Sequence, residues 1–170
     1  DLCRLCLWFG MVLNLPHSEE ELMYLADLHD LGKINMDINF LSQTCSLDEN
    51  GWKKIKKHPE IGYRIAQAIH QISTISDAIW AHHERWDGTG YPRGLSKENI
   101  PLLARVLAIA DAYDAMRCGR PYQPPLKKEE AMNELLRCSG SQFDPNLVNL
   151  FIKHCPIITS EEVFMNNINN

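Results

Sequence analysis

The sequence lacks any run of about eighteen apolar residues, which is the length a helix needs to cross a bilayer. It also shows no charged start followed by an apolar stretch, so no secretory signal is visible. Basic residues are too few for a polyanion-binding surface: the formal net charge of -5 argues against binding DNA or RNA through many phosphates. A small anionic ligand stays compatible with this charge, because a few local cations can hold one.

A second pair of closely spaced cysteines is also missing. Cys3 and Cys6 lie three residues apart on a helical pattern and would face the same side, as half of a zinc site. Without a partner pair, we interpret the six cysteines as reduced thiols of a cytoplasmic protein, with the zinc half-site as the alternative.

No segment alternates apolar and polar residues over the length of a strand. Apolar spacing near 3.6 residues instead predicts helices along most of the chain. These helices are expected at 1–14, 19–32, after Ser46 with an interruption at Pro59, and at 73–84, 101–116, 127–138 and 145–154. The sequence therefore predicts an all-α fold in one domain, 1–170, with 101–116 as the buried central helix because it is apolar almost all round. Because the pattern is already helical at its first residues, we expect this domain to be part of a longer protein.

Several ionisable residues interrupt these apolar patterns. His29 and Asp30 are adjacent, just before a glycine, and Asp111 lies on the predicted central helix. His58 stands at a helix start, and the pair His82–His83 ends another helix. Each has an ordinary interpretation, such as a satisfied core histidine, a solvated helix end or a helix-pairing acid. Together, imidazoles and carboxylates in apolar surroundings indicate a site for a metal such as iron, manganese or zinc.

The segment "IWAHHERWDGTGYPRGL" joins the two histidines to a loop. Gly88 and Gly90 permit a tight turn with backbone close to a substrate or metal. Tyr91 and Trp86 offer aromatic faces on which a base can stack, although packing of the loop onto the helices is the alternative and is favoured for Trp86.

The order of these motifs resembles the HD-GYP family, a subgroup of the HD metal-dependent phosphohydrolases. "LHDLGKI" is similar to the HD segment, and "IKKHPEIG" to the next histidine segment. "HHERWDGTGYP", the following "IPLLARVLAIADAYDAM", "RPYQ" and "FDPNLV" match the later segments. The resemblance implies an all-α HD-domain bundle of about seven or more helices, with a metal site in its core.

The resemblance also implies the ligands of two divalent ions. The implied metal ligands are His29, Asp30, His58, His82, His83 and Asp111. Asp30 would bridge the two ions, and iron or manganese would be the usual metal, with zinc or nickel compatible with purified protein. In the family a further histidine and glutamate lie on the first helix, which here would fall before Asp1, so two ions and three ions both stay open.

The implied activity is hydrolysis of cyclic di-GMP to the linear dinucleotide pGpG or on to GMP. Two ions activate a water and clamp the phosphate in such reactions. Asp30 and Lys33 are then the expected catalytic residues, and Lys33, Arg120, Gly90 and Tyr91 the expected substrate contacts. The alternatives are hydrolysis of another cyclic dinucleotide and a catalytically inactive regulatory module. Expected partners are a cyclase domain or another protein bound through the GYP loop, and a second copy of the chain.

Overall fold

The computed structural model describes residues 1–37, 48–119 and 124–158 of the chain. Within these ranges it contains α-helices, short 3-10 helices and a single isolated bridge between Ser139 and Phe143 in place of strands. The α-helices are α1 (Leu2–Leu13), α2 (Glu19–Leu28), α4 (Glu49–Ile55), α5 (His58–Gln67), α6 (Ser76–Ala81), α7 (Leu102–Cys118), α8 (Lys128–Arg137) and α9 (Pro145–Ile158). The 3-10 helices are η1 (Leu31–Asn35), η2 (His70–Ile75) and η3 (Lys97–Asn99). The predicted all-α fold class is confirmed.

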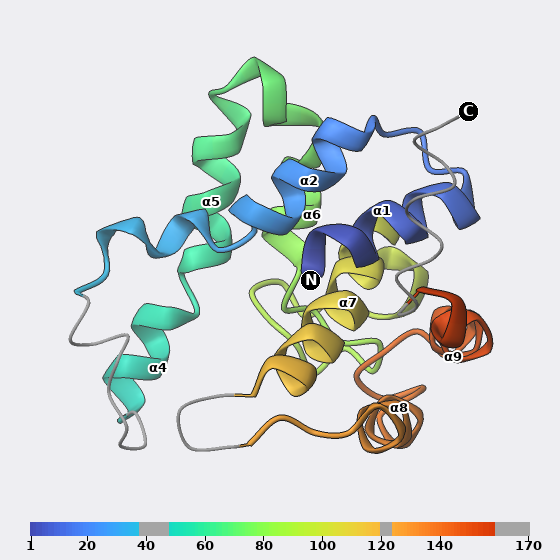
Figure 1. Cartoon of the computed structure of the whole chain (residues 1–170). Coiled ribbons are helices and arrows are strands. Elements are labelled where there is room, and N and C mark those ends of the chain that lie inside the picture. Colours follow the sequence, from blue (N-terminus) through green and yellow to red (C-terminus); the bar gives the residue numbers. More distant parts are fainter. Residues whose placement is uncertain (38–47, 120–123, 159–170) are drawn as a thin grey trace.

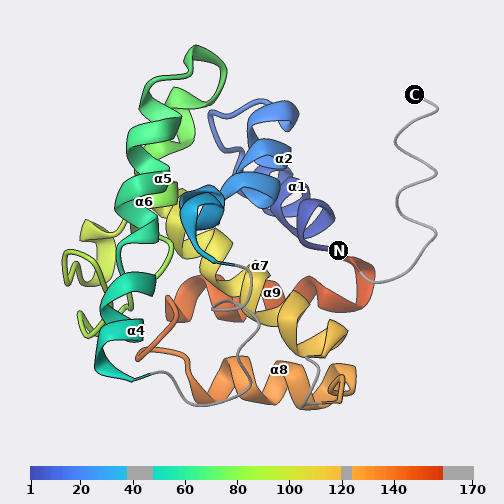
Figure 2. The same ribbon diagram turned by 90° about the vertical axis from the view of Figure 1, so that its left-hand side faces the viewer.

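Helix α7 is the centre of the molecule, as its apolar sequence predicts. It runs between α1 and α2 on one side and α8 and α9 on the other, with α5 and α6 beside it (Figures 1 and 2). It packs against α1, α6, α8 and α9. Its buried residues occupy more than half of its circumference because neighbouring helices pack against it on several sides. They are Leu103, Ala104, Val106, Leu107, Ile109, Ala110 and Tyr113.

The start of α2 at residue 19 is confirmed. Ser18 caps the helix by accepting from the backbone N–H of Glu21, and the Glu21 carboxylate accepts from the backbone N–H of Ser18. This reciprocal arrangement satisfies two N–H groups that the first helical turn leaves without partners. Within the described ranges, no helix is both long and apolar enough to cross a membrane.

Two predicted helix boundaries are wrong. The helix expected over 19–32 ends at Leu28, and the backbone then turns and tightens into η1, where Lys33 N–H bonds the carbonyl of Asp30 at 2.9 Å. The helix expected over 73–84 is split into η2 and α6 and ends at Ala81. The cap of α4 is Asp48, which accepts from Gly51 N–H at 2.7 Å, whereas the predicted cap Ser46 lies outside the described residues.

The change from α2 to η1 brings two backbones into direct contact. Gly32 in η1 lies so close to α5 that an added Cβ would be 1.9 Å from the carbonyl oxygen of His58 and 2.7 Å from the amide nitrogen of Gly62. Gly62 in turn faces the backbone nitrogen of Gly32 and the side chain of Ile79. Two glycines thus allow the segment after α2 to approach the start of α5.

We therefore expect Gly32→Ala to destabilise the protein by about 3 kcal/mol, because the atoms it would meet are backbone atoms that cannot rotate away. The measurement is urea unfolding followed by circular dichroism. Gly140→Asn is the matched control: no atom lies within 4 Å of a Cβ at Gly140, and asparagine tolerates its positive φ of 78°. Equal stability of the two variants would contradict the close-packing interpretation.

Candidate metal centre and adjoining cavity

Three histidines of the site are oriented in the same way by the backbone. In each, the ring Nδ1 lies within hydrogen-bond distance of the carbonyl oxygen three residues earlier. The pairs are His29–Ala26 at 2.9 Å, His58–Ile55 at 2.7 Å and His82–Ile79 at 2.6 Å. A carbonyl can only accept, so Nδ1 carries the proton, and in the neutral ring Nε2 keeps its lone pair. All three rings are therefore prepared to bind a metal through Nε2.

These Nε2 atoms converge on the carboxylate of Asp30. The Nε2 atom of His58 lies 3.1 Å from Asp30 Oδ1, that of His82 3.7 Å from the same oxygen, and that of His29 3.7 Å from Oδ2. The Nε2 atoms of His58 and His82 are only 3.2 Å apart. Lone pairs facing one another and a carboxylate repel, unless a cation lies among them.

A buried oxygen points to the same conclusion. Asp30 Oδ1 is buried and has no hydrogen-bond donor among the described residues. Burial acts to raise the pKa of Asp30, but the Lys33 ammonium beside Oδ2 helps to hold that pKa well below the usual range. The carboxylate is thus ionised, and a bound cation would satisfy the oxygen that no donor reaches.

The predicted metal ligands come together from four separate segments. Single ligand atoms of Asp30, His58, His82 and His83 all lie within 4.8 Å of one another. Asp111 on α7 stands at the edge of this group, with its Oδ1 4.0 Å from the Nε2 atom of His29. A donor set of imidazoles and carboxylates fits a borderline divalent metal, so the residues present match the metal predicted from the sequence.

His83 connects the cluster to the loop that follows it. Its ring stacks on that of Tyr91 with centroids 4.8 Å apart, and its backbone carbonyl accepts from Tyr91 N–H. Burial, assisted by the neighbouring His82 and His58, lowers the pKa of His83 to about 2. Burial likewise lowers the pKa of His82. Both rings are therefore neutral near pH 7, the state in which imidazole binds metal.

Lys33 reaches the site by a different route from the one predicted. The sequence placed it one α-helical turn after His29, whereas in the structure it lies in η1. Its Nζ lies 2.6 Å from Asp30 Oδ2, and both side chains are partly exposed. Lys33 therefore stands where the carboxylate meets solvent, within reach of an anion approaching Asp30.

Glu84, for which the sequence indicated no role, supports the GYP loop. It is 4% exposed, and its two carboxylate oxygens accept from the backbone N–H groups of Arg93 at 2.7 Å and Leu95 at 3.0 Å. Gly90 is held against this residue, since a Cβ there would lie 2.6 Å from the Cα of Glu84. Gly90 is thus required for packing of the loop. That Glu84 follows the histidine pair was visible in the sequence, but its hydrogen bonds to Arg93 and Leu95 depend on how the loop folds back.

The loop is also joined to the segment before α9. The backbone N–H groups of Trp86 and Asp87 donate to the carbonyls of Gln142 and Ser141. The guanidinium of Arg105, on α7, lies 5.8 Å from the ring centre of Trp86. This contact agrees with the interpretation favoured from the sequence, in which Trp86 packs the loop onto the helices. The loop is therefore connected to two distant parts of the chain.

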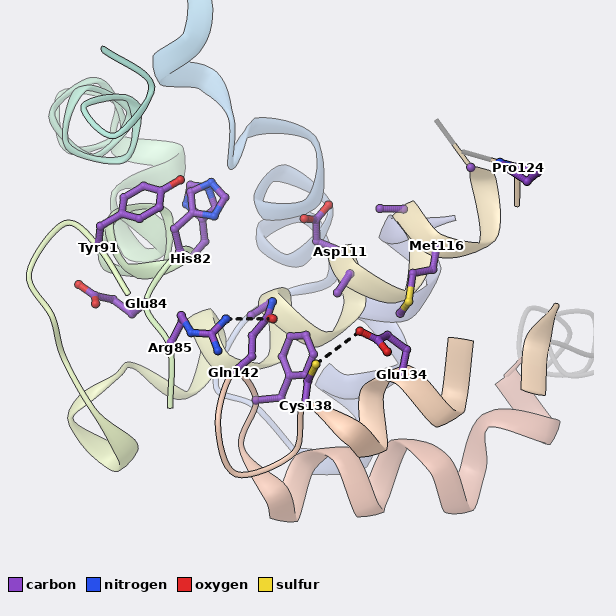
Figure 3. Close-up of a pocket in the computed structure, with 16 residues that line it drawn as sticks. His82, Glu84, Arg85, Tyr91, Asp111, Met116, Pro124, Glu134, Cys138 and Gln142 are labelled. Carbon is purple, nitrogen blue, oxygen red and sulfur yellow. Dashed lines mark hydrogen bonds between the residues drawn. The ribbon is translucent and has the colours of Figure 1, made fainter. Parts of the chain in front are cut away.

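A cavity of about 490 Å³ adjoins the metal cluster (Figure 3). His82, His83, Tyr91 and Asp111 line it on the side of the cluster, and residues of α7, α8 and the segment before α9 line the rest. Its size is typical of a site for a small organic ligand. Of the predicted substrate contacts, Tyr91 lines this cavity, and Arg120 lies outside the described residues.

The comparison with protein families agrees with this geometry. The HD domain family matches residues 2–147. The chain therefore belongs to the HD-domain family. Its curated relatives and the DGTGYP loop after the histidine pair place it in the HD-GYP subgroup, so the predicted family is confirmed.

Curated relatives carry two kinds of name. A cyclic di-GMP phosphodiesterase of Thermotoga maritima is 38% identical over 135 residues, which are 78% of this chain and 37% of that protein. The cyclic di-GMP phosphodiesterase response regulator RpfG of Xanthomonas campestris is 38% identical over 85% of this chain and 40% of that protein. The 3'3'-cGAMP-specific phosphodiesterase 2 of Vibrio cholerae is 35% identical over 88% of this chain and 29% of that protein. The chain thus spans less than half the length of these relatives.

Two solved structures share the fold. A cyclic GMP-AMP specific phosphodiesterase of Vibrio cholerae, V-cGAP3, superposes with a TM-score of 0.69 at 18% identity, covering 99% of this chain and 48% of that one. An HD-GYP-type protein of Bdellovibrio bacteriovorus superposes with a TM-score of 0.63 at 23% identity, covering 87% of this chain and 48% of that one. At these identities the similarity establishes the fold.

The lowered pKa of His83 predicts acid sensitivity of the metal-free protein. The pKa of this ring is 6.5 in an unfolded chain and about 2 in the folded chain. The unfolded state therefore binds the extra proton between these values, and the free energy of unfolding falls as the pH drops below 6.5, by roughly 1 kcal/mol per pH unit. His83→Gln should make this slope shallower. Urea unfolding between pH 7 and 4.5 measures it, and His70→Gln, at an exposed position, should keep the full slope.

Glu84→Gln should destabilise the loop, because the new amide group cannot accept from both backbone donors. We expect a loss of about 2 kcal/mol in urea unfolding and faster hydrogen exchange at Arg93 and Leu95. Glu98→Gln, an exposed substitution in the same loop, is the control and should change neither measurement. Unchanged exchange at Arg93 and Leu95 in Glu84→Gln would show that the carboxylate does not hold the loop.

Proposed function

We propose that this chain is the phosphodiesterase domain of a longer signalling protein and hydrolyses cyclic di-GMP with the help of divalent metal ions. The observation that carries the proposal is the buried, donor-free Oδ1 of Asp30 facing the Nε2 atoms of His58 and His82 beside a cavity, with the Nε2 atom of His29 next to Oδ2. The names of the curated relatives support the cyclic dinucleotide as substrate.

The proposed ligands divide between two ions that share Asp30. His29 and Asp111 would complete one set of ligands, and His58, His82 and His83 the other. Iron or manganese is the proposed metal, since imidazole and carboxylate oxygen suit both. Divalent ions bound there would lower the pKa of a water and offset charge on the phosphoryl oxygens. A third ion would need ligands beyond these six.

The chain's own residues position the phosphate and its charge. Lys33, held at 2.6 Å by Asp30, is the cation at the solvent edge of the cluster and would contact a phosphate oxygen. Tyr91 is proposed to flank the bound dinucleotide from the loop. We retain Arg120 as a second phosphate contact and Gly90 as a point of close backbone approach, both from the family resemblance.

Two further proposals concern the cellular setting. A cytoplasmic location fits the four free cysteines of the described residues, Cys3, Cys6, Cys118 and Cys138. The exposed part of the GYP loop, around Pro92 and Arg93, is a proposed contact for a cyclase domain or another protein, and a homodimer is proposed as the assembly.

The direct test is hydrolysis of cyclic di-GMP by protein loaded anaerobically with iron or manganese, with pGpG and GMP separated by chromatography. Lys33→Met should lower kcat/KM by about 100-fold, because a charge contact to the phosphate is lost. Lys53→Met is the control: that lysine forms a surface ion pair with Glu49 and is 66% exposed. Binding of cyclic di-GMP without turnover by the metal-loaded protein would instead support a regulatory module.

A further inference from the structure

The cavity continues past the metal cluster into a part that the proposed chemistry does not use. Away from His82 and Tyr91 it is bordered by Met116 on α7 and Glu134 on α8, and Gln142 lies beside Arg85 at its near end (Figure 3). We call this part the distal recess. It is defined by the lining residues Met116, Glu134, Cys138, Gln142 and Phe143.

The distal recess combines apolar surface with two polar side chains. Phe143 is 4% exposed, and Met116 lines the recess from α7. Ala112 and Ala115 line the same side of the cavity with small side chains, which leaves room beside them. A planar, apolar-faced group with a polar edge suits such a lining, and a nucleobase has this character.

The amide of Gln142 is held in a defined orientation. Arg85 Nη1 donates to Gln142 Oε1 at 3.1 Å, and Arg85 is itself fixed by Thr89, whose Oγ1 accepts from Nε at 3.0 Å. Because the guanidinium can only donate, it must face the carbonyl oxygen of the amide. The Nε2 group of Gln142 is therefore left as a donor at the cavity wall.

Glu134 supplies acceptors on α8. Its carboxylate forms an ion pair with Arg137, at 2.8 Å from Nε and 2.5 Å from Nη2, and accepts from Cys138 Sγ at 3.6 Å. This pairing keeps the carboxylate charged and oriented. Each carboxylate oxygen can accept more than one hydrogen bond, so acceptor capacity remains toward the cavity.

From this arrangement we infer that the distal recess binds one base of the cyclic dinucleotide and that Glu134, together with Gln142, selects guanine there. The inference rests on the proposed function. The edge of guanine carries the O6 acceptor beside N1–H and N2–H donors, which match an amide donor and a carboxylate. Adenine places a donor where guanine has O6 and an acceptor at N1, so its N1 would face the carboxylate without a hydrogen.

The test compares Glu134→Gln with Glu129→Gln in the metal-loaded protein. We expect the wild type to prefer cyclic di-GMP over cyclic di-AMP in kcat/KM, and Glu134→Gln to reduce this ratio about 10- to 100-fold. Glu129→Gln makes the same substitution at an exposed position of α8 that does not line the cavity, and it should leave the ratio unchanged. A ratio unaltered in Glu134→Gln, or lowered equally in both variants, would overturn the inference.

Equilibrium binding separates this inference from the proposed activity. Titration calorimetry with GMP and AMP needs no turnover. We expect GMP to bind more tightly than AMP to the wild type and to Glu129→Gln, but not to Glu134→Gln. If no cyclic dinucleotide is hydrolysed while this GMP preference holds, the proposed function fails and the base site stands. Turnover of cyclic di-GMP with equal binding of GMP and AMP would reject the base site alone.

Discussion

The central constraint on this molecule is the placement of the Asp30 carboxylate among imidazole nitrogens that carry no proton. Each of His29, His58 and His82 donates a hydrogen bond from Nδ1 to the carbonyl three residues earlier, so each neutral ring presents the Nε2 lone pair to the same point. Without a cation this arrangement is repulsive, because a buried carboxylate oxygen and facing lone pairs have no compensating charge. The helix ends, the glycine contacts and the loop can all be understood as the means of holding these groups together.

Two close contacts maintain that arrangement from opposite sides. Gly32 lets the segment after α2 touch the start of α5, which fixes Asp30 relative to His58. On the other side, buried Glu84 follows the histidine pair directly and binds the backbone of the returning loop. Since His83 and Tyr91 are stacked, the position of the loop and that of the metal cluster depend on each other. The catalytic and recognition parts proposed for this domain are therefore mechanically linked.

Much of this could be predicted from the sequence, for identifiable reasons. Helices were predictable from apolar spacing, and Asp30, His58 and Asp111 stood out because ionisable residues rarely interrupt such patterns without a partner. The end of α2 was not predictable in the same way, since the chain leaves the α-helix to make a tertiary contact that propensity does not report. Glu134 and Gln142 carried no signal, because both residue types are ordinary on exposed helix and loop surfaces.

The sequence by itself determined the all-α class, the buried central helix and the family, because these depend on local periodicity and on the order of short motifs. Only the tertiary structure decided which atoms meet: the direction of each Nε2, the orphaned oxygen of Asp30, the bonds of Glu84 and the recess bordered by α7 and α8. The physical reason is that hydrogen bonding and metal binding depend on distances of a few ångströms between residues far apart in the chain. Such distances follow from helix packing, which the spacing of residues along one helix does not specify.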